Sequence, residues 1–404
     1  MTLPGTAAGA ALPLHGITVL SLEHAVAAPF ATRQLADLGA RVIKVERPGS
    51  GDFARQYDDS VNGESSYFVW LNRSKESIAL DVKSEDGRKV LHELADQADV
   101  ILQNLGPGAA ARLGLSAEEV RARDPKKIVV SVTGWGSTGP WADRKAYDLL
   151  VQCETGLVSL TGTPDDVAKV GVSIADIAAG MYAFSGTLAA LYRRQVTGEG
   201  ATIEVSLFES LAEWVGQPAH FTAGAGRQPG RFGAQHATIA PYGPFAAGDG
   251  HTVLIAIQNE PEWSRFCSEV LQRPDIAEDP RFASSTQRVA HRNEVNDTIT
   301  KVFATLPTPE LQARLTAARI AFAGVNTIGE FLEHPILQAR DRWRTVETEH
   351  GPVRALLPPI DLGVEAQMGP VPALGEHTAD ILTELGHDPL AFAGESEQRS
   401  EELT

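Results

Sequence analysis

Hydrophobic positions along the first 215 residues follow two alternating patterns. Short apolar runs predict strands at Ile17–Leu22, Arg41–Glu46, Ser77–Val82, Asp99–Leu102, Ile128–Val132 and Thr202–Ser206. Apolar residues at helical spacing predict helices at Pro29–Leu38, Ser84–Gln97, Ser116–Arg123, Asp176–Val196 and Leu207–Val215. Because short strands separated by helices form βαβ units, this pattern predicts an α/β domain with a mostly parallel sheet over residues 1–215.

The pattern changes at Gly216. Residues 216–250 contain eight Gly and four Pro, which predicts a long loop or crossover. Residues 251–325 begin with a predicted strand at Thr252–Ile257 and continue with helices, which indicates a smaller, α-rich domain. Those helices are expected at Pro261–Gln272, Thr286–Ala304 and Thr308–Ala318. Residues 326–404 return to short strands and turns and include a last short helix at Asp380–Leu385.

The composition is that of a globular protein of two or three domains. The chain has 404 residues, of which 43% are hydrophobic and 22% charged. A net charge of −17 repels phosphate backbones and argues against nucleic acid as a partner, but it leaves room for a local basic pocket. The two cysteines, Cys153 and Cys267, are too few for a disulfide framework or a zinc cluster, and they suit a reducing compartment.

Hydropathy and the chain ends predict a cytoplasmic protein. No apolar run approaches the roughly 18 residues of a membrane span, so we expect no membrane partner. The first basic residue is Arg33, so the start of the chain lacks the charged region of a secretory signal. The small residues Met1–Ala11 are expected to be disordered, and the polar tail Glu395–Thr404 to be solvated.

Several known catalytic motifs are absent from the sequence. The turn after the first predicted strand, from Glu23 to Pro29, contains no glycine, whereas a dinucleotide-binding turn needs G-x-G-x-x-G. Neither a P-loop, nor H-E-x-x-H, nor G-x-S-x-G occurs. The sequence therefore argues against NAD, P-loop nucleotide, zincin and α/β-hydrolase chemistry, and it predicts no metal site.

Polar and basic residues follow the predicted strands at the edge where open α/β sheets bind ligands. These positions are His24, Ala25, Arg47, Asn104, Leu105, Thr133 and Trp135. Arg47, Lys75 and Arg112 would supply positive charge for a phosphate-bearing ligand in an otherwise acidic protein. Each basic residue could equally cap a helix or lie solvated on the surface.

Asp176 stands at the start of the longest predicted helix. Aspartate is a favoured N-cap, so a structural role is one interpretation. The other is catalytic, because amides at a helix N-terminus keep a carboxylate ionised, and an ionised carboxylate can attack an activated acyl group. The small residues Ala178, Ala179 and Gly180 leave room for a ligand, or for close helix packing.

Several segments together resemble the class III CoA-transferases. They are HGITVLSLEHAVAAPFATRQLADLGARVIKVERPGSGDFAR (His15–Arg55), LNRSKESIALDVK (Leu71–Lys83), QNLGPGAAARLGL (Gln103–Leu115), SVTGWGSTGP (Ser131–Pro140), Val172–Leu211 and LGEHTADILTELG (Leu374–Gly386). The resemblance implies an interlaced homodimer. It also implies a large Rossmann-like domain built from both ends of the sequence and a smaller domain from the middle.

The resemblance also implies a mechanism and a set of site residues. The family's catalytic aspartate falls on Asp176, which would form a mixed anhydride and then an aspartyl-CoA thioester. Acyl-CoA and a carboxylic acid acceptor would be the substrates, and no permanently bound cofactor is needed. CoA contacts are expected at His24, Ala25, Val26, Ala27, Arg47, Leu71, Lys75, Asn104, Leu105, Arg112 and Trp135.

The resemblance leaves the substrate and one rival activity open. The sequence looks most like enzymes of C4 and C5 dicarboxylyl-CoA esters, such as mesaconyl-CoA C1–C4 CoA-transferase and succinyl-CoA-dependent dicarboxylate CoA-transferases. Formyl-CoA transferases carry a run of consecutive glycines in an active-site loop. This sequence has no such run, which argues against oxalate and formate as substrates. The second carboxylate of a dicarboxylate would need a partner such as Arg227, Arg231 or His236.

Two alternatives are an α-methylacyl-CoA racemase and a non-catalytic acyl-CoA-binding protein on the same fold. The racemase histidine would fall on Tyr147. A phenol with an ordinary pKa of about 10 makes a poor proton shuttle at neutral pH. This favours CoA transfer over racemisation.

Overall fold

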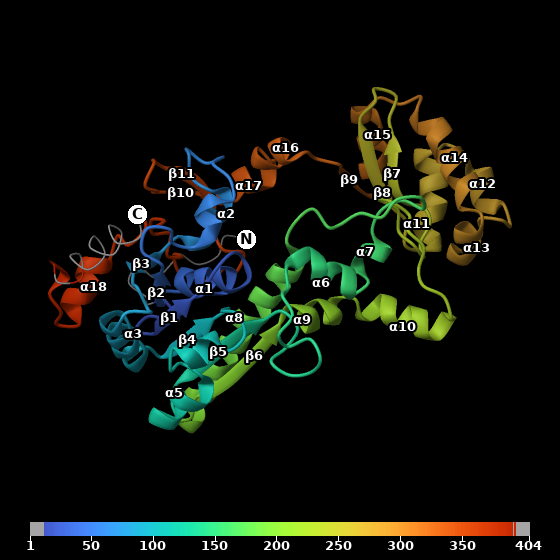
Figure 1. The fold of residues 1–404 in the computed structure, drawn as a ribbon. Coiled ribbons are helices and arrows are strands. Elements are labelled where there is room, and N and C mark those ends of the chain that lie inside the picture. The colour runs from blue at the N-terminus through green and yellow to red at the C-terminus, as the bar shows by residue number, and fades with distance from the viewer. Residues whose placement is uncertain (1–11, 391, 393–404) are drawn as a thin grey trace. The chain divides into compact units, whose positions relative to one another are not determined.

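The computed structural model describes residues 12–390 and 392. The expectations for Met1–Ala11 and Glu395–Thr404 lie outside these residues. The chain divides into two compact units (Figure 1). We call Met1–Thr155, Gly171–Gly216 and Arg340–Thr404 the large unit, and Gly156–Val170 and Gln217–Ala339 the small unit. The small unit thus takes 156–170 and 326–339, which the sequence had assigned to the large domain.

The large unit is built on a six-stranded parallel sheet with the order β3-β2-β1-β4-β5-β6. Its strands are β1 (Thr18–Leu22), β2 (Arg41–Glu46), β3 (Lys75–Ala79), β4 (Val100–Gln103), β5 (Ile128–Thr133) and β6 (Ala201–Ser206). Every neighbouring pair is parallel. The order reverses beside β1, which is the switch point at which such sheets bind ligands. The predicted α/β fold is confirmed.

Helices connect these strands, and several begin at residues that cap them. They are α1 (Ala27–Asp37), α2 (Ser66–Asn72), α3 (Glu85–Gln97), α4 (Ala109–Arg112), α5 (Ala117–Arg123), α6 (Asp148–Glu154), α8 (Ile174–Thr197) and α9 (Leu207–Trp214), with a 3-10 turn at Phe53–Gln56. The Ser84 hydroxyl accepts the Gly87 N–H at the start of α3. Ser116 and Glu119 form a capping box on α5. The starts of α3 and α5 are where the sequence predicts them.

The C-terminal part of the chain completes the edge of this sheet. Helix α18 (Thr378–Glu384) packs on β3, and its Ile381 and Leu382 join the core beneath the sheet. The Ala79 N–H donates to the Thr378 hydroxyl (2.9 Å), and the Ser77 N–H to His377 Nδ1 (3.2 Å). These bonds satisfy backbone groups of an edge strand, so the two ends of the sequence build one unit. A separate hairpin joins β10 (Trp343–Val346) to β11 (Val353–Leu356).

The long helix α8 packs on α1, α9, β5 and β6. By length and composition alone it could cross a membrane, contrary to the expectation that no apolar run approaches a span. Its contacts with the sheet and its neighbouring helices mark it as a core helix. At Gly180 a Cβ would lie 2.6 Å from the Ala27 carbonyl oxygen, so glycine permits the close approach of α8 to the start of α1.

The small unit contains more β-structure than the sequence indicated. Strands β7 (Tyr242–Ala246), β8 (Thr252–Ala256) and β9 (Ala321–Gly324) form an antiparallel sheet in that order. The segment 216–250, expected to be a loop, contains β7 and also a helix, α10 (Gly216–Ala225). The other helices are α7 (Leu157–Leu160), α11 (Glu260–Arg265) with a π-helical turn (Phe266–Val270), α12 (Pro274–Glu278), α13 (Ser285–Ala290), α14 (Arg292–Phe303), α15 (Thr308–Ala317), α16 (Ile328–Leu332) and α17 (Pro335–Ala339).

Candidate active site

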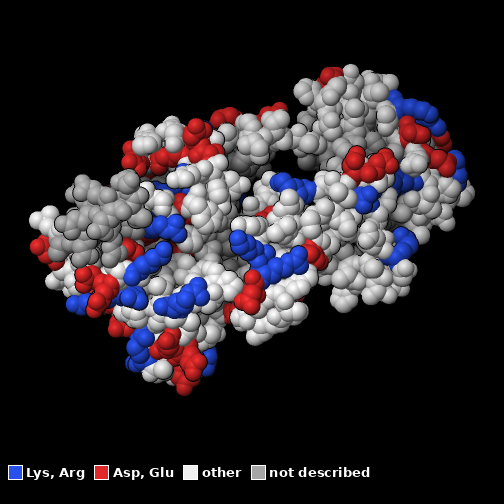
Figure 2. Space-filling view, in the orientation of Figure 1, with Lys and Arg blue, Asp and Glu red and all other residues white. Residues whose placement is uncertain are grey.

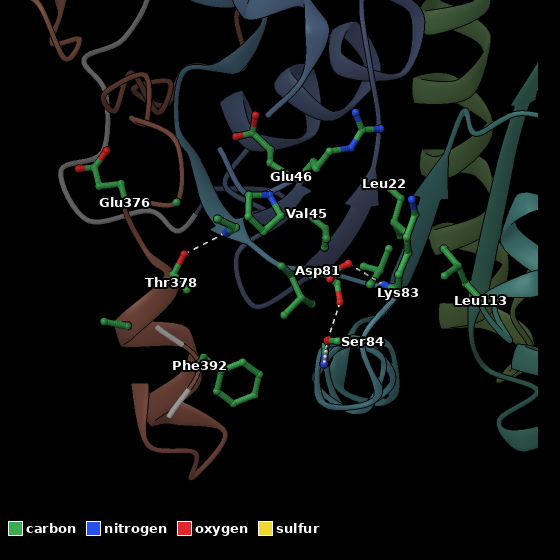
Figure 3. Close-up of a pocket in the computed structure, with 18 of the residues that line it drawn as sticks. Leu22, Val45, Glu46, Asp81, Lys83, Ser84, Leu113, Glu376, Thr378 and Phe392 are labelled. Atoms are coloured by element: carbon green, nitrogen blue, oxygen red, sulfur yellow. Dashed lines mark hydrogen bonds between the residues drawn. The ribbon is translucent and has the colours of Figure 1, made fainter. Parts of the chain in front are cut away.

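A cavity of about 780 Å³ opens in the large unit beside the carboxyl ends of β1, β2 and β3 (Figure 3). Its apolar lining is Leu22, Val45, Leu80, Val82, Leu105, Leu113 and Phe392. Arg47 and Lys83, both exposed, supply positive charge to it. Three carboxylates also line it, Glu46, Asp81 and Glu376, of which Glu46 is bonded to Arg55. The volume and the apolar lining suit a nucleotide-sized ligand, and Arg47 and Lys83 are the cations available to a phosphate.

Three of the CoA contacts expected from the sequence line this cavity: His24, Arg47 and Leu105. Leu71 and Lys75 do not. The Leu71 side chain is fully buried, and Lys75 at the first residue of β3 is only 3% exposed. Lys75 Nζ donates to Glu23 (2.7 Å), to Asn72 (3.0 Å) and to the Pro29 carbonyl (3.1 Å). All three donors of this ammonium are used inside the protein, so in this structure it has none left for a ligand.

The cavity also contains residues that the sequence analysis missed. Leu80 and Lys83 follow β3 at its carboxyl end, and Thr378 and Phe392 come from the C-terminal segment. Figure 3 shows Thr378 and Phe392 on the side of α18, and Ser84 at the start of α3. The rule that ligands lie beyond the carboxyl ends of strands would have selected Lys83 over Lys75. Sequence spacing contained no signal for Phe392.

Charge on the molecular surface is mixed where it can be seen. On the face drawn in Figure 2, acidic and basic side chains are interspersed over both units. The charge at the cavity is mixed as well, since Arg47 and Lys83 share its lining with Glu46, Asp81 and Glu376.

The turn from His24 to Ala27 leads from the cavity to the start of α1. The Asn104 side chain holds it on one side, since Asn104 Oδ1 accepts the His24 N–H and Asn104 Nδ2 donates to the His24 carbonyl, both at 2.9 Å. Ala25 adopts a left-handed φ of 61°. Val26 and Ala27 are buried, so His24 and Ala25 are the parts of this turn that a ligand can reach.

Asp176 lies in the first turn of α8, but it is not the N-cap that one interpretation of the sequence suggested. The helix begins at Ile174, with Ser173 at the cap position. The amides of this turn are engaged by Asp148, whose Oδ1 accepts the N–H groups of Ala175 (2.7 Å) and Asp176 (3.3 Å). A second carboxylate, absent from the sequence prediction, therefore occupies the helix terminus.

The environment of Asp176 favours its protonated form. Burial and the nearby Asp148 carboxylate raise the pKa of Asp176 from 3.8 to about 7. The expectation that the helix N-terminus keeps Asp176 ionised differs from this result, because burial and the charge of Asp148 both favour the protonated carboxyl group. Perturbed carboxyl groups of this kind are typical of catalytic sites.

Two tyrosines belong to the surroundings of Asp176. Tyr147 is 65% exposed and precedes Asp148 at the start of α6. Burial and the charges of Asp52 and Asp176 raise the pKa of Tyr57 to about 12. Tyr57 therefore lies close enough to Asp176 for the two groups to interact electrostatically. Tyr57 was not identified from the sequence. Its ring contacts Phe53, which in turn stacks on His24 at the cavity.

Helices α1 and α8 pack closely near Asp176. Gly180 lies one helical turn after Asp176 and faces the Ala27 carbonyl at the end of the His24–Ala27 turn. An extended ligand with one end in the cavity could therefore follow this turn and reach the first turn of α8.

The remaining predicted residues lie outside the cavity lining. Arg112 is exposed on α4. Trp135 follows β5, where its indole N–H donates to the Lys145 carbonyl (3.3 Å) and its ring meets Trp141 edge-on at 5.0 Å. Thr133 ends β5, and its hydroxyl accepts the Gly136 N–H.

Three candidates for binding a second carboxylate belong to the small unit. The Arg231 guanidinium donates to the carbonyls of Thr163 (2.7 Å) and Pro164 (2.8 Å). Arg227 lies over the ring of Phe221 at 5.5 Å. His236 stacks on Tyr242 at 5.1 Å. Among the residues that the structure describes, no group of three or more His, Cys, Asp or Glu is placed to hold a metal ion.

Comparison with known proteins identifies the family of the chain. The sequence profile of CoA-transferase family III matches residues 14–378. The succinate–glutarate CoA-transferase of Agrobacterium fabrum is 36% identical over 388 residues, which cover 92% of this chain and 96% of that protein. The acetyl-CoA:oxalate CoA-transferase of Acetobacter aceti is 37% identical over 297 residues, 73% of this chain and 76% of that protein.

A solved structure agrees with these relatives. The crystal structure of a CAIB/BAIF family protein from Brucella suis superimposes with a TM-score of 0.82 at 33% identity, and the match covers 93% of this chain and 100% of that one. The resemblance to class III CoA-transferases is confirmed.

Proposed function

The chain belongs to CoA-transferase family III and is a CoA-transferase, and we propose that it moves CoA between short dicarboxylic acids through a covalent intermediate on Asp176. CoA thioesters and free carboxylates are the substrates of this class. The observation that carries the proposal is the Asp176 carboxyl group. It lies in the first turn of α8 and has a pKa raised to about 7 by burial and by the Asp148 carboxylate.

The proposed reaction uses only the Asp176 carboxylate and the two substrates. A carboxylate oxygen attacks the thioester carbonyl carbon, the C–S bond breaks, and CoA thiolate leaves behind an acyl–aspartyl anhydride. The thiolate then attacks the aspartyl carbonyl carbon, which releases the donor acid and forms an aspartyl-CoA thioester. The acceptor carboxylate displaces the thiolate from this thioester to form a second anhydride. The thiolate returns to the acceptor acyl carbon and frees Asp176, so no net proton is consumed.

We place the adenosine and phosphate end of CoA in the cavity, with Arg47 and Lys83 as its cations. The pantetheine arm would follow His24 and Ala25 toward Asp176. Leu71 and Lys75 would support this surface from inside rather than contact the ligand, because both are buried. No step requires a metal or a redox cofactor.

The dicarboxylate preference rests on the relatives. The acceptors named for the Agrobacterium and Acetobacter enzymes, glutarate and oxalate, are both dicarboxylic acids. Tyr147, Arg227 and His236 are the candidates to bind the second carboxylate, since Arg231 is already bonded to backbone carbonyls. Glutarate, mesaconate and oxalate should therefore be compared as acceptors in one assay.

Family resemblance further supports an interlaced homodimer, and the low cysteine content supports a reducing compartment such as the cytoplasm. Light scattering at micromolar concentration should give twice the mass of the 43.2 kDa chain, whereas an active monomer would contradict the interlaced arrangement.

The covalent intermediate can be tested by trapping it. Incubation with succinyl-CoA followed by mild hydroxylamine should convert an activated Asp176 to its hydroxamate, which mass spectrometry locates on the α8 peptide. An Asp176→Asn variant treated in the same way is the control. An unlabelled enzyme that exchanges the α-proton of a 2-methylacyl-CoA for deuterium would instead indicate a racemase.

Lys83→Met should raise the KM for succinyl-CoA about tenfold, because a charge-assisted contact with phosphate is worth about 1.5–3 kcal/mol. The KM for the acceptor should change little. Lys89→Met is the matched control, since Lys89 is also exposed, lies on α3 and does not line the cavity. Equal KM values for the two variants would place the CoA phosphates elsewhere.

A further inference from the structure

Four charged side chains in the large unit form one connected group without exposed surface, and the proposed reaction uses none of them. They are Glu23, Lys44, Asp52 and Lys75, each with 0% side-chain exposure. We call this group the buried charge quartet. Glu23 follows β1, Lys44 lies within β2, Asp52 follows β2, and Lys75 begins β3. Glu23 and Asp52 thus lie at the strand ends that border the cavity, and the two lysine side chains reach them from within the sheet.

The quartet forms a chain of alternating charge. Lys75 Nζ lies 2.7 Å from Glu23 Oε1, and Lys44 Nζ lies 3.5 Å from the same oxygen and 2.8 Å from Asp52 Oδ2. The Thr32 hydroxyl donates to the other oxygen of Glu23 at 2.7 Å. Two positive and two negative charges balance one another, which such complete burial requires.

All four groups are held in their charged forms at neutral pH. Burial alone would raise the pKa values of Glu23 and Asp52, but their lysine partners lower both. Burial would lower the pKa of Lys44, but Asp52, Glu23 and Glu46 raise it. Burial lowers the pKa of Lys75 to about 8, which still leaves it mainly protonated at pH 7. Buried ion pairs contribute little to stability compared with apolar packing. Stability alone therefore does not explain why these four charges are buried.

The end of the quartet that faces the ligand path bonds directly to the His24–Ala25 turn. Asp52 Oδ1 accepts the Ala25 N–H at 3.1 Å and the Ala54 N–H at 2.9 Å, while its Oδ2 is held by Lys44. Ala25 has the left-handed φ of 61°, which a residue with a Cβ adopts only when its surroundings hold it there. Asn104 holds the neighbouring His24 backbone from the other side.

We propose that the buried charge quartet is a positioning device that fixes Asp52, and through Asp52 the left-handed turn at Ala25, in the shape that receives the pantetheine arm of CoA. The inference rests on the proposed placement of CoA along this turn. Asp52 is a positioning residue, because its carboxylate is fully buried and acts through the Ala25 N–H.

Asp52→Ala tests the proposal against a matched variant, Asp37→Ala. Asp37 is an equally buried carboxylate of the large unit, paired with Arg33 at 3.0 Å and Arg73 at 2.7 Å, and it does not line the cavity. Both variants should lower the Tm. Only Asp52→Ala should raise the KM for succinyl-CoA and the calorimetric Kd for CoA, each about tenfold, while the acceptor KM stays within about threefold.

Unchanged CoA affinity in a folded Asp52→Ala variant would overturn the proposal, and so would the same KM increase in Asp37→Ala. If Asp52→Ala does not fold, Asn104→Ala loosens the same turn from its partly exposed side. It should also raise the KM for succinyl-CoA, and an unchanged value would overturn the proposal as well. Failure of the proposed function is distinguishable, because the unaltered protein would then transfer no CoA from succinyl-CoA, whereas the calorimetric Kd for CoA tests the quartet by itself.

Discussion

Asp176→Asn is expected to lower kcat for CoA transfer at least about a thousandfold, because it removes the nucleophile on which both proposed covalent intermediates form. The Kd for CoA should remain within about tenfold of the unaltered enzyme, since the cavity and the His24–Ala25 turn are unchanged. A coupled assay with succinyl-CoA measures the first quantity and calorimetry with CoA the second. Asp176→Ala is the second variant, because an alanine cannot revert to aspartate by deamidation.

Asp176→Asn should also stabilise the folded protein above pH 7. The folded pKa of Asp176 is about 7, above its ordinary 3.8, so the folded state favours the protonated form. The stability that the protonated Asp176 contributes to the folded state is present below pH 4 and is lost as the pH rises to 7 and beyond. At those pH values the folded protein holds the negative charge of Asp176 in a largely buried place. Asparagine carries no such charge, so the free energy of unfolding at pH 8 should increase by about 1–3 kcal/mol.

Together these two measurements separate a lost nucleophile from a lost fold. A folded variant that is more stable at pH 8 and inactive agrees with the assignment. Turnover above about a tenth of the original rate in either variant would show that Asp176 is not the nucleophile.

Asp148→Asn should move the acidic limb of the activity profile to lower pH by on the order of one unit. Only the ionised Asp176 can attack a thioester, so activity of the unaltered enzyme should rise with pH through about 7. Removing the Asp148 charge lowers the pKa of Asp176, and more carboxylate is then present at pH 6. The asparagine oxygen can still accept the N–H groups of Ala175 and Asp176, so the helix terminus stays capped.

Asp143→Asn is the control for this prediction. Asp143 is an exposed carboxylate five residues earlier in the same connection between β5 and α6, and it does not contribute to the pKa of Asp176. Its substitution should leave the profile in place. A limb that moves equally in both variants would reflect general surface charge, and a limb that moves in neither would mean that another group controls the rate below pH 7.

The positions of most strands could be predicted because each is a local apolar run that lies in the sheet. Strand β3 is an exception, because its predicted and observed ends differ. Its register with β2 ends at Ala79, but the apolar run continues through Leu80 and Val82. Those two residues are apolar because they line the cavity, and periodicity alone cannot distinguish a ligand wall from a sheet.

The candidate site divides in the same way. Asp176 could be recognised from its motif and its place before small residues, and His24, Arg47 and Leu105 from their positions after strands. Lys75 and Lys83 lie in one quoted segment, and the choice between them depends on which end of β3 faces the cavity. Phe392 reaches the cavity only because α18 packs on β3, a contact between segments some 300 residues apart in the sequence.

By itself, then, the sequence determined the family and the parallel α/β core and singled out Asp176 as the candidate nucleophile, because these are expressed in local periodicity and in a contiguous motif. The tertiary structure decided which cations line the cavity, and it buried Asp176 close to Asp148, so that the pKa of Asp176 rises. It also buried four balanced charges beneath the turn at Ala25. These properties depend on distances between groups that are far apart along the chain, and only packing determines those distances.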